Sequence, residues 1–241
     1  MLAWENKWGA LVHGNDEVTV IMPIYNEGKT AYSIITRVLA QPMVDKLLVV
    51  YDESSDNTLD EIKRAMAGDK NSRCTLIMSD RKMGKGHAVR QGMAQTTNGI
   101  VIIQDADEEY CPEDYGKLLG ALTDMHPVFG SRPRNEGKRY LMGVLATRVH
   151  TVVFNVLYSQ SIHDMNAAYK IFKVSMLKGR GLRQEGWQMD PEIAIVLAKN
   201  GYKIVSVDIR YKGRTFEEGK KISAKDGIAI LMYIIRQRFT K

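Results

Sequence analysis

Residues 100–110, IVIIQDADEEY, join a short apolar run to a cluster of acids. A β-branched run bounded by polar residues predicts a buried strand at 100–103. Ligands of open α/β sheets bind beyond the carboxyl ends of such strands. Asp105, Asp107 and Glu109 alternate along an extended segment, so their side chains would share one side. Neighbouring carboxylates repel unless a cation lies among them, and oxygen ligands suit Mg²⁺ or Mn²⁺; a solvated acidic turn is the alternative.

The segments around this stretch alternate between strand and helix patterns. Strands are expected at residues 18–24, 46–51, 74–78 and 100–103, and helices at 28–40, 56–67 and 87–95. The second half is more helical, with helices expected at 113–124, 138–159, 190–200 and 223–238 and one strand at 203–211. Alternation at this spacing is typical of βαβ units. It predicts an α/β fold with a doubly wound, mostly parallel sheet and helices on both faces.

The composition is that of a globular protein, with 44% hydrophobic and 26% charged residues among 241. The net charge of +6 favours a polyanionic partner, and charge alone does not choose among a nucleoside diphosphate, an anionic lipid and a nucleic acid. The two cysteines, Cys74 and Cys111, are too few for a disulfide framework, so we expect reduced thiols in a cytoplasmic protein. No apolar run reaches the roughly 18 residues of a membrane span, and no signal peptide is expected.

Two further strand tips carry polar residues. The first strand ends in Pro23-Ile24-Tyr25-Asn26-Glu27, whose polar groups would face the ligand; a simple turn with Asn26 as helix cap is an equal alternative. The second ends in residues 51–58, YDESSDNT, which superficially resembles a calcium loop but lacks its glycine and final glutamate. Asp52 can instead accept hydrogen bonds from a base or ribose, while Ser55 or Asp56 can also cap the next helix.

Two basic segments could meet phosphate groups. Residues 82–87, KMGKGH, combine glycines that permit close backbone approach with two lysines, one of them Lys85, although the segment is no P-loop. Residues 211–221, YKGRTFEEGKK, place Arg214 and Lys220 near glycines, which suggests a loop that can close over an anion. A solvated charge run is the alternative for this loop.

The order of these motifs resembles a known family. PIYNE, DESSDNT, GKG, QDADEEY, GSR, DMNAAYKIF, QMDPE and RTFEEGKKI follow one another as in family 2 glycosyltransferases, within the branch of dolichyl- and polyprenyl-phosphate mannose synthases. The resemblance covers about residues 18–227, and the DAD element with the RxxxEGKK loop is its most specific part. It implies a GT-A fold, a nucleotide-sugar donor such as GDP-mannose or UDP-glucose, Mg²⁺ or Mn²⁺, and inverting transfer of a hexose to a polyprenyl or dolichyl phosphate.

The resemblance also implies roles for particular residues. The nucleotide-binding residues would be Pro23, Tyr25, Glu27, Asp52, Lys85 and Lys220, and the catalytic residues Asp105, Asp107 and Arg214. The metal ligands would be Asp107 and Glu109, whereas Arg132 and Arg148 would meet the acceptor phosphate and Asp164 and Glu192 would line the sugar pocket. After an extension at residues 1–17, residues 18–241 would form one GT-A domain, with a nucleotide-sugar half at 18–130 and an acceptor half at 131–241. Family members often have Gln where Glu109 stands.

The acceptor chemistry and the helix pattern agree with this implication. A phosphomonoester is largely ionised near neutral pH, so it needs guiding cations and no general base. Residues 140–158 and 223–238 are amphipathic and basic, and such helices can lie at the cytoplasmic face of a membrane; packed core helices are the alternative.

Two other functions compete with this one. A GT-A enzyme with a non-lipid sugar acceptor, or a sugar-nucleotide nucleotidyltransferase, would share the donor residues. A basic protein that binds nucleic acid without catalysis would leave the acidic cluster at Asp105–Glu109 without a purpose, and the chain lacks interleaved aromatic and basic residues.

Overall fold

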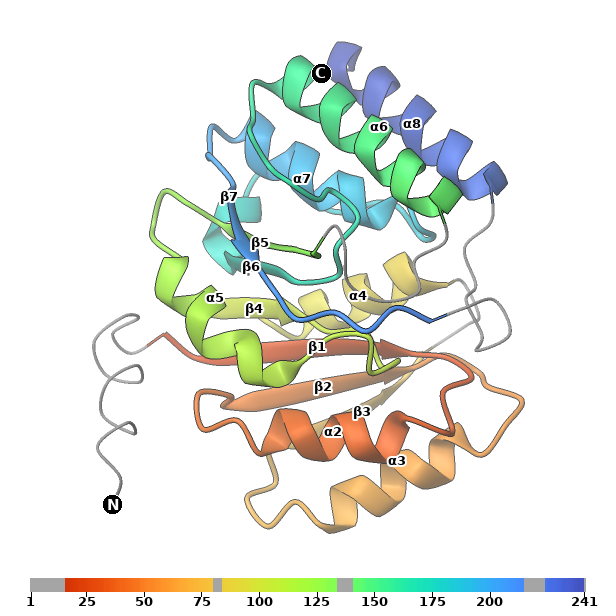
Figure 1. Cartoon of the computed structure of the whole chain (residues 1–241). Coiled ribbons are helices and arrows are strands. Elements are labelled where there is room, and N and C mark those ends of the chain that lie inside the picture. The colour runs from red at the N-terminus through yellow and green to blue at the C-terminus, as the bar shows by residue number, and fades with distance from the viewer. Residues whose placement is uncertain (1–15, 80–83, 134–140, 215–223, 241) are drawn as a thin grey trace.

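The computed structural model describes residues 16–79, 84–133, 141–214 and 224–240. Its centre is a seven-stranded sheet of order β3-β2-β1-β4-β6-β5-β7 (Figure 1). The strands are β1 (Val18–Ile24), β2 (Lys46–Tyr51), β3 (Cys74–Met78), β4 (Ile100–Ile103), β5 (Val128–Ser131), β6 (Lys170–Lys173) and β7 (Val205–Asp208). β3, β2, β1 and β4 are parallel, and β6 is antiparallel to both of its neighbours. The predicted α/β class with a mostly parallel sheet is confirmed.

The central strands are buried along most of their length because they are covered on both faces. β4 is buried at every residue, and β1 is buried at all but Pro23. Near-continuous apolar strands of this kind are typical of parallel sheets between two helix layers. β1 pairs with β2 on one side and β4 on the other, so the direction of winding reverses between β1 and β4. Ligands of doubly wound sheets bind at the carboxyl ends of the strands at such a reversal.

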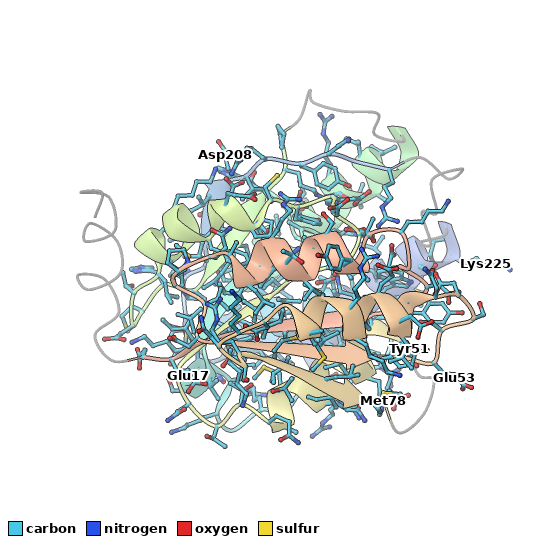
Figure 2. The ribbon with its side chains drawn as sticks, turned by 90° about the horizontal axis from the view of Figure 1, so that it is seen from below. Glu17, Tyr51, Glu53, Met78, Asp208 and Lys225 are labelled. Carbon is cyan, nitrogen blue, oxygen red and sulfur yellow. The ribbon has the colours of Figure 1, made fainter. Side chains whose placement is uncertain are left out.

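Helices cover both faces of the sheet. They are α2 (Ala31–Leu39), α3 (Thr58–Ala67), α4 (Lys85–Ala94), α5 (Tyr115–Ala121), α6 (Leu141–Tyr158), α7 (Met189–Lys199) and α8 (Ala224–Phe239), with 3₁₀ turns at η1 (Pro112–Asp114) and η2 (Val174–Leu177). In Figure 2, α2 and α5 lie on one face of the sheet and α4 on the other. α6 and α8 run side by side as an outer pair that contacts α7 (Figure 1).

The structure corrects several expected elements. β5 and β6 were not expected, the strand expected at 203–211 spans only Val205–Asp208, and the helix expected at 113–124 is η1 followed by the short α5. β6 was hidden because lysines flank its two apolar residues, yet Lys170 is fully buried. The proposed extension at 1–17 lies almost entirely outside the described residues.

Candidate functional site

The tips of β1 and β2 are tied together by hydrogen bonds. Asn26 has a left-handed backbone (φ 50°), and its side-chain oxygen accepts from the backbone N–H of Ser55 at 2.8 Å. Ser54 Oγ accepts from the backbone N–H of Asn26 at 2.9 Å. Asn26 therefore joins the two tips, while Thr30 stands at the cap of α2. Figure 2 shows Tyr51 and Glu53 at one end of the sheet, opposite Glu17.

Asp52 lies at this edge and is buried, with 5% of its surface exposed. Its carboxylate accepts from the backbone N–H groups of Glu53 at 3.1 Å and Gly84 at 3.3 Å. Gly84 has φ 92°, which favours glycine, and it starts α4 beside Asp52. Gly86 allows close backbone approach as expected, but to the chain itself: an added Cβ would lie 2.4 Å from the backbone oxygen of Gln184.

The acidic tip after β4 is held by the segment that follows β7. Tyr110 and Tyr211 form an isolated antiparallel bridge. Tyr211 donates its hydroxyl to Glu109 Oε2 at 2.7 Å, and the backbone N–H of Arg214 donates to Glu109 Oε1 at 2.6 Å. Both oxygens of Glu109 therefore have hydrogen-bond donors from one loop.

The guanidinium of Arg214 lies among the acids of two strand tips. Its Nη2 is 2.8 Å from Glu27 Oε2 and 3.9 Å from Asp107 Oδ2, and its Nε donates to the backbone oxygen of Asp107 at 2.9 Å. The Arg214 side chain is 18% exposed and that of Glu27 is 11% exposed, so the pair is largely shielded from water. A positive group thus stands where the sequence placed a divalent cation. Among the described residues, no group of three or more His, Cys, Asp or Glu side chains converges, so any cation here would be held by one or two carboxylates together with the ligand's own phosphates.

A second charged cluster lies next to this one and comprises Lys85, Asp105, Asp190 and Lys170. Lys85 Nζ is 2.7 Å from Asp105 Oδ1 and 3.6 Å from Asp190 Oδ2, and Lys170 Nζ is 2.7 Å from Asp190 Oδ1. Burial opposes the charge of Lys85, but the carboxylates of Asp105 and Asp190 raise its pKa above the usual value. Likewise, burial is outweighed by the ammonium groups of Lys170 and Lys85, which hold the pKa of Asp190 below its usual range. Burial lowers the pKa of Lys170, although Asp190 acts in the opposite direction. The cluster is two ion pairs in contact, with no net charge.

The residues predicted to meet the acceptor or the sugar have different surroundings in the structure. Arg132 forms a two-armed ion pair with Asp164, with Nε–Oδ2 and Nη2–Oδ1 distances of 2.7 and 2.9 Å. Arg148 is exposed on α6. Glu192 is buried and accepts from the backbone N–H groups of residues 183 and 184 at 2.8 and 2.9 Å, so its carboxylate fixes that segment.

The remaining predicted residues lie at the expected edge or outside the described chain. Pro23 is the last residue but one of β1, which ends at Ile24, and Tyr25 follows the strand directly. Lys220 lies outside the described residues. Sequence reasoning missed the roles of Asp190, Lys170 and Tyr211 in the site. Asp190 and Lys170 did stand within the QMDPE and YKIF motifs, and that position was the available signal.

Comparison with known proteins agrees with this geometry. The family model for "Glycosyl transferase family 2" matches residues 19–181. Glycosyltransferase AglJ of Haloferax volcanii is 25% identical over 230 residues, which cover 93% of this chain and 73% of AglJ. The undecaprenyl-phosphate 4-deoxy-4-formamido-L-arabinose transferase of Photorhabdus laumondii is 23% identical over 207 residues, which cover 85% of this chain and only 62% of that enzyme's length.

The structure also resembles a solved enzyme. Glucosyl-3-phosphoglycerate synthase from Mycobacterium tuberculosis, crystallised with Mn²⁺, UDP and glucosyl-3-phosphoglycerate, superposes with a TM-score of 0.68 at 18% identity, over 92% of this chain and 80% of that one. This likeness identifies the fold as GT-A. Since the family model covers well over half of the chain, the protein belongs to glycosyltransferase family 2.

Proposed function

We propose that this enzyme transfers a hexose, mannose or glucose, from a nucleotide sugar to a polyprenyl or dolichyl phosphate with inversion of the anomeric carbon. The observation that carries the proposal is the position of Arg214, which contacts Glu27, Asp107 and Glu109 at the carboxyl edge of the sheet. Residues 18–241 would form a single GT-A unit, with the donor bound by residues 18–130 and the acceptor by residues 131–241.

The donor set fits a divalent cation. Carboxylates and a backbone oxygen are hard ligands of the kind that Mg²⁺ and Mn²⁺ prefer. In the structure the positive group that contacts these oxygens is the Arg214 guanidinium. Asp107 and Glu109 would hold the metal, which would neutralise the diphosphate as it leaves. Asp52, which accepts from the backbone N–H of Gly84, would also accept hydrogen bonds from the nucleoside, and Lys85, which lies beside Asp105, would meet the sugar or the phosphates.

The acceptor needs no general base in this scheme. A phosphate monoester already carries the charge of a nucleophile, so the protein has only to guide it and exclude competing water. Arg148, exposed on α6, is a candidate for that guidance. Arg132 pairs with Asp164 through Nε and Nη2, so it could meet an acceptor phosphate only with its remaining N–H groups or by leaving Asp164.

The outer helix pair supports contact with a membrane surface. Exposed apolar side chains are Leu145, Val149, Val152 and Val156 on α6 and Ile228, Met232, Ile235 and Phe239 on α8. Exposed cations beside them are Arg148, Lys225, Arg236 and Arg238, and α6 contains no acid. Apolar faces flanked by cations bind anionic lipid surfaces. Lys225, at the start of α8, lies toward the same end of the molecule as Tyr51 and Glu53 (Figure 2).

None of the described helices is both long and apolar enough to cross a bilayer. The exposed apolar and basic side chains of α6 and α8 are our reason to propose peripheral contact with the cytoplasmic face of a membrane. There α6 and α8 would bring the strand tips near a lipid phosphate.

A transfer assay tests the proposal. Purified protein is incubated with GDP-mannose or UDP-glucose, with Mn²⁺ or chelator, and with either polyprenyl phosphate in vesicles or 3-phosphoglycerate as acceptor. We expect a sugar phosphodiester of inverted configuration, formed only with metal and only on the lipid phosphate. Transfer to phosphoglycerate or to a neutral sugar while the lipid is ignored would refute the acceptor assignment and favour the non-lipid alternative.

A further inference from the structure

Lys170 is a charged residue in an otherwise apolar position. Its side chain is fully buried and its ammonium lies 5.2 Å from the centre of the Phe129 ring. The ammonium donates to the backbone oxygen of Ala167 at 2.5 Å and to Asp190 Oδ1 at 2.7 Å. A buried charge is costly unless it is paired and hydrogen-bonded. The effect of Lys170 on the site should therefore act through its charged partner, Asp190.

The two oxygens of Asp190 have different surroundings. Oδ1 faces Lys170, whereas Oδ2 is 3.6 Å from Lys85, beyond ordinary hydrogen-bond distance. Lys85 lies closer to Asp105, at 2.7 Å. The Asp190 side chain is 11% exposed and that of Lys85 is 12% exposed, whereas Lys170 is fully buried, so only Asp190 and Lys85 can contact a ligand directly.

We propose that Lys170 is a positioning residue for recognition of the donor sugar, an inference that rests on the proposed function. By holding Oδ1, Lys170 keeps Asp190 from closing both oxygens onto Lys85. Oδ2 and the Lys85 ammonium then stand side by side as an acceptor and a donor. Each sugar hydroxyl both donates and accepts a hydrogen bond, so neighbouring hydroxyls match this pair.

Loss of Lys170 would change both members of the pair. Asp190 would turn its two oxygens to Lys85, the nearest remaining cation, and draw it away from Asp105. The sugar would then meet an internal ion pair in place of an open acceptor and donor. Lys85 here acts as a ligand of the sugar and not of the phosphates. The nucleoside and diphosphate contacts, which are then made by Asp52 and the acidic tip, would be unaffected.

A purely structural role predicts a different result. If Lys170 only fastens β6 to α7, its removal would lower stability and weaken all ligands alike. The informative quantity is therefore the ratio of two dissociation constants, that of the nucleotide sugar over that of the matching nucleoside diphosphate.

The experiment measures this ratio by calorimetry for GDP-mannose against GDP and UDP-glucose against UDP, with Mn²⁺ present. The variants are Lys170→Met, Asp190→Asn, the double variant, and Lys170→Arg. We expect the ratio for the true donor to rise at least tenfold in Lys170→Met and Asp190→Asn, while the diphosphate constant changes less than twofold. In the double variant the ratio should rise no more than in either single variant, and in Lys170→Arg it should stay at the wild-type value.

The double variant also guards against misfolding. Lys170→Met leaves Asp190 charged and partly buried, so it can fail to fold, whereas the double variant removes both charges with little change in volume. A folded double variant that keeps the wild-type ratio overturns the inference. Wild-type protein that binds neither nucleotide sugar overturns the proposed function and this inference with it.

Discussion

Replacing Arg214 with glutamine should strengthen the binding of Mn²⁺ to the enzyme in the absence of nucleotide. In the structure the Arg214 guanidinium neutralises Glu27 at 2.8 Å and lies 3.9 Å from Asp107. A metal ion that binds Asp107 must displace or repel this group. Arg214 and the metal therefore compete at Asp107, and a metal bound there would push the guanidinium off both of its hydrogen bonds.

The size of the effect follows from the contacts that the metal must break. Arg214 makes one charge-assisted hydrogen bond to Glu27 and one hydrogen bond from Nε to the backbone oxygen of Asp107. A hydrogen bond to a charged group contributes about 1.5–3 kcal/mol net. Removal of that competition should tighten Mn²⁺ binding by roughly 10-fold to 150-fold, at about 1.4 kcal/mol per factor of ten.

Free Mn²⁺ can be measured directly by electron paramagnetic resonance during titration of the protein. Arg210→Gln is the matched control, since it removes the same charge from a residue paired with Asp114, whose carboxylate the cation site does not use. Arg210→Gln should leave the Mn²⁺ dissociation constant within about twofold. Unchanged or weaker Mn²⁺ binding in Arg214→Gln would refute the idea that this guanidinium occupies the place of the cation.

Four further outcomes are expected. Asp107→Asn should abolish metal-dependent transfer while changing the free energy of unfolding by no more than about 0.5 kcal/mol, as measured in urea. Arg132→Gln should lower that free energy by about 3 kcal/mol because it leaves Asp164 buried without its partner. Arg148→Gln should raise the KM for polyprenyl phosphate in vesicles and leave the melting temperature unchanged, because Arg148 is exposed; an unchanged KM would remove it from the acceptor path. Burial lowers the pKa of His150 below its usual value, so the neutral ring is favoured on folding. Stability should therefore be full above a pH of about 6.5 and fall as the pH decreases toward the folded-state pKa, and His150→Gln should flatten this part of the stability profile.

Most of the strands that could be predicted are runs of consecutive apolar residues. β1, β2 and β4 occur at the expected bounds, because a strand covered on both faces is a continuous apolar run. β3 also occurs at the expected bounds, although it lies at the edge of the sheet and only Cys74 in it is buried. β6 gave no such signal, since Lys170 and Lys173 bracket only two apolar residues. Its lysine is tolerated in the core because Asp190, 20 residues later, approaches from the start of α7. A pairing of that separation is a property of the tertiary fold.

The same distinction applies to the site. The acidic tip could be predicted because its carboxylates directly follow β4. The expected alternation along an extended segment was wrong, because residues 106–109 form a turn in which Glu108 has φ 57°. The pairing of each cation with its acid could not be predicted, because the contacts join residues that are far apart in sequence. Arg214 was expected at a diphosphate and lies on Glu27, whereas Arg132 was expected at an acceptor phosphate and lies on Asp164.

These pairings bear on how substrates can enter. Three cations of the site each have a carboxylate partner within 3 Å in the structure, namely Arg214, Lys85 and Arg132. A diphosphate arriving alone would have to take a cation from its acid and leave that acid unbalanced in a shielded site, which is costly. A divalent cation arriving alone would leave Arg214 unbalanced in the same way. Metal and diphosphate together bring opposite charges, so the metal can take over the acids while the freed guanidinium meets the phosphate. Each ligand thereby removes the penalty that opposes the other, and by reciprocity each strengthens the other's binding by the same factor.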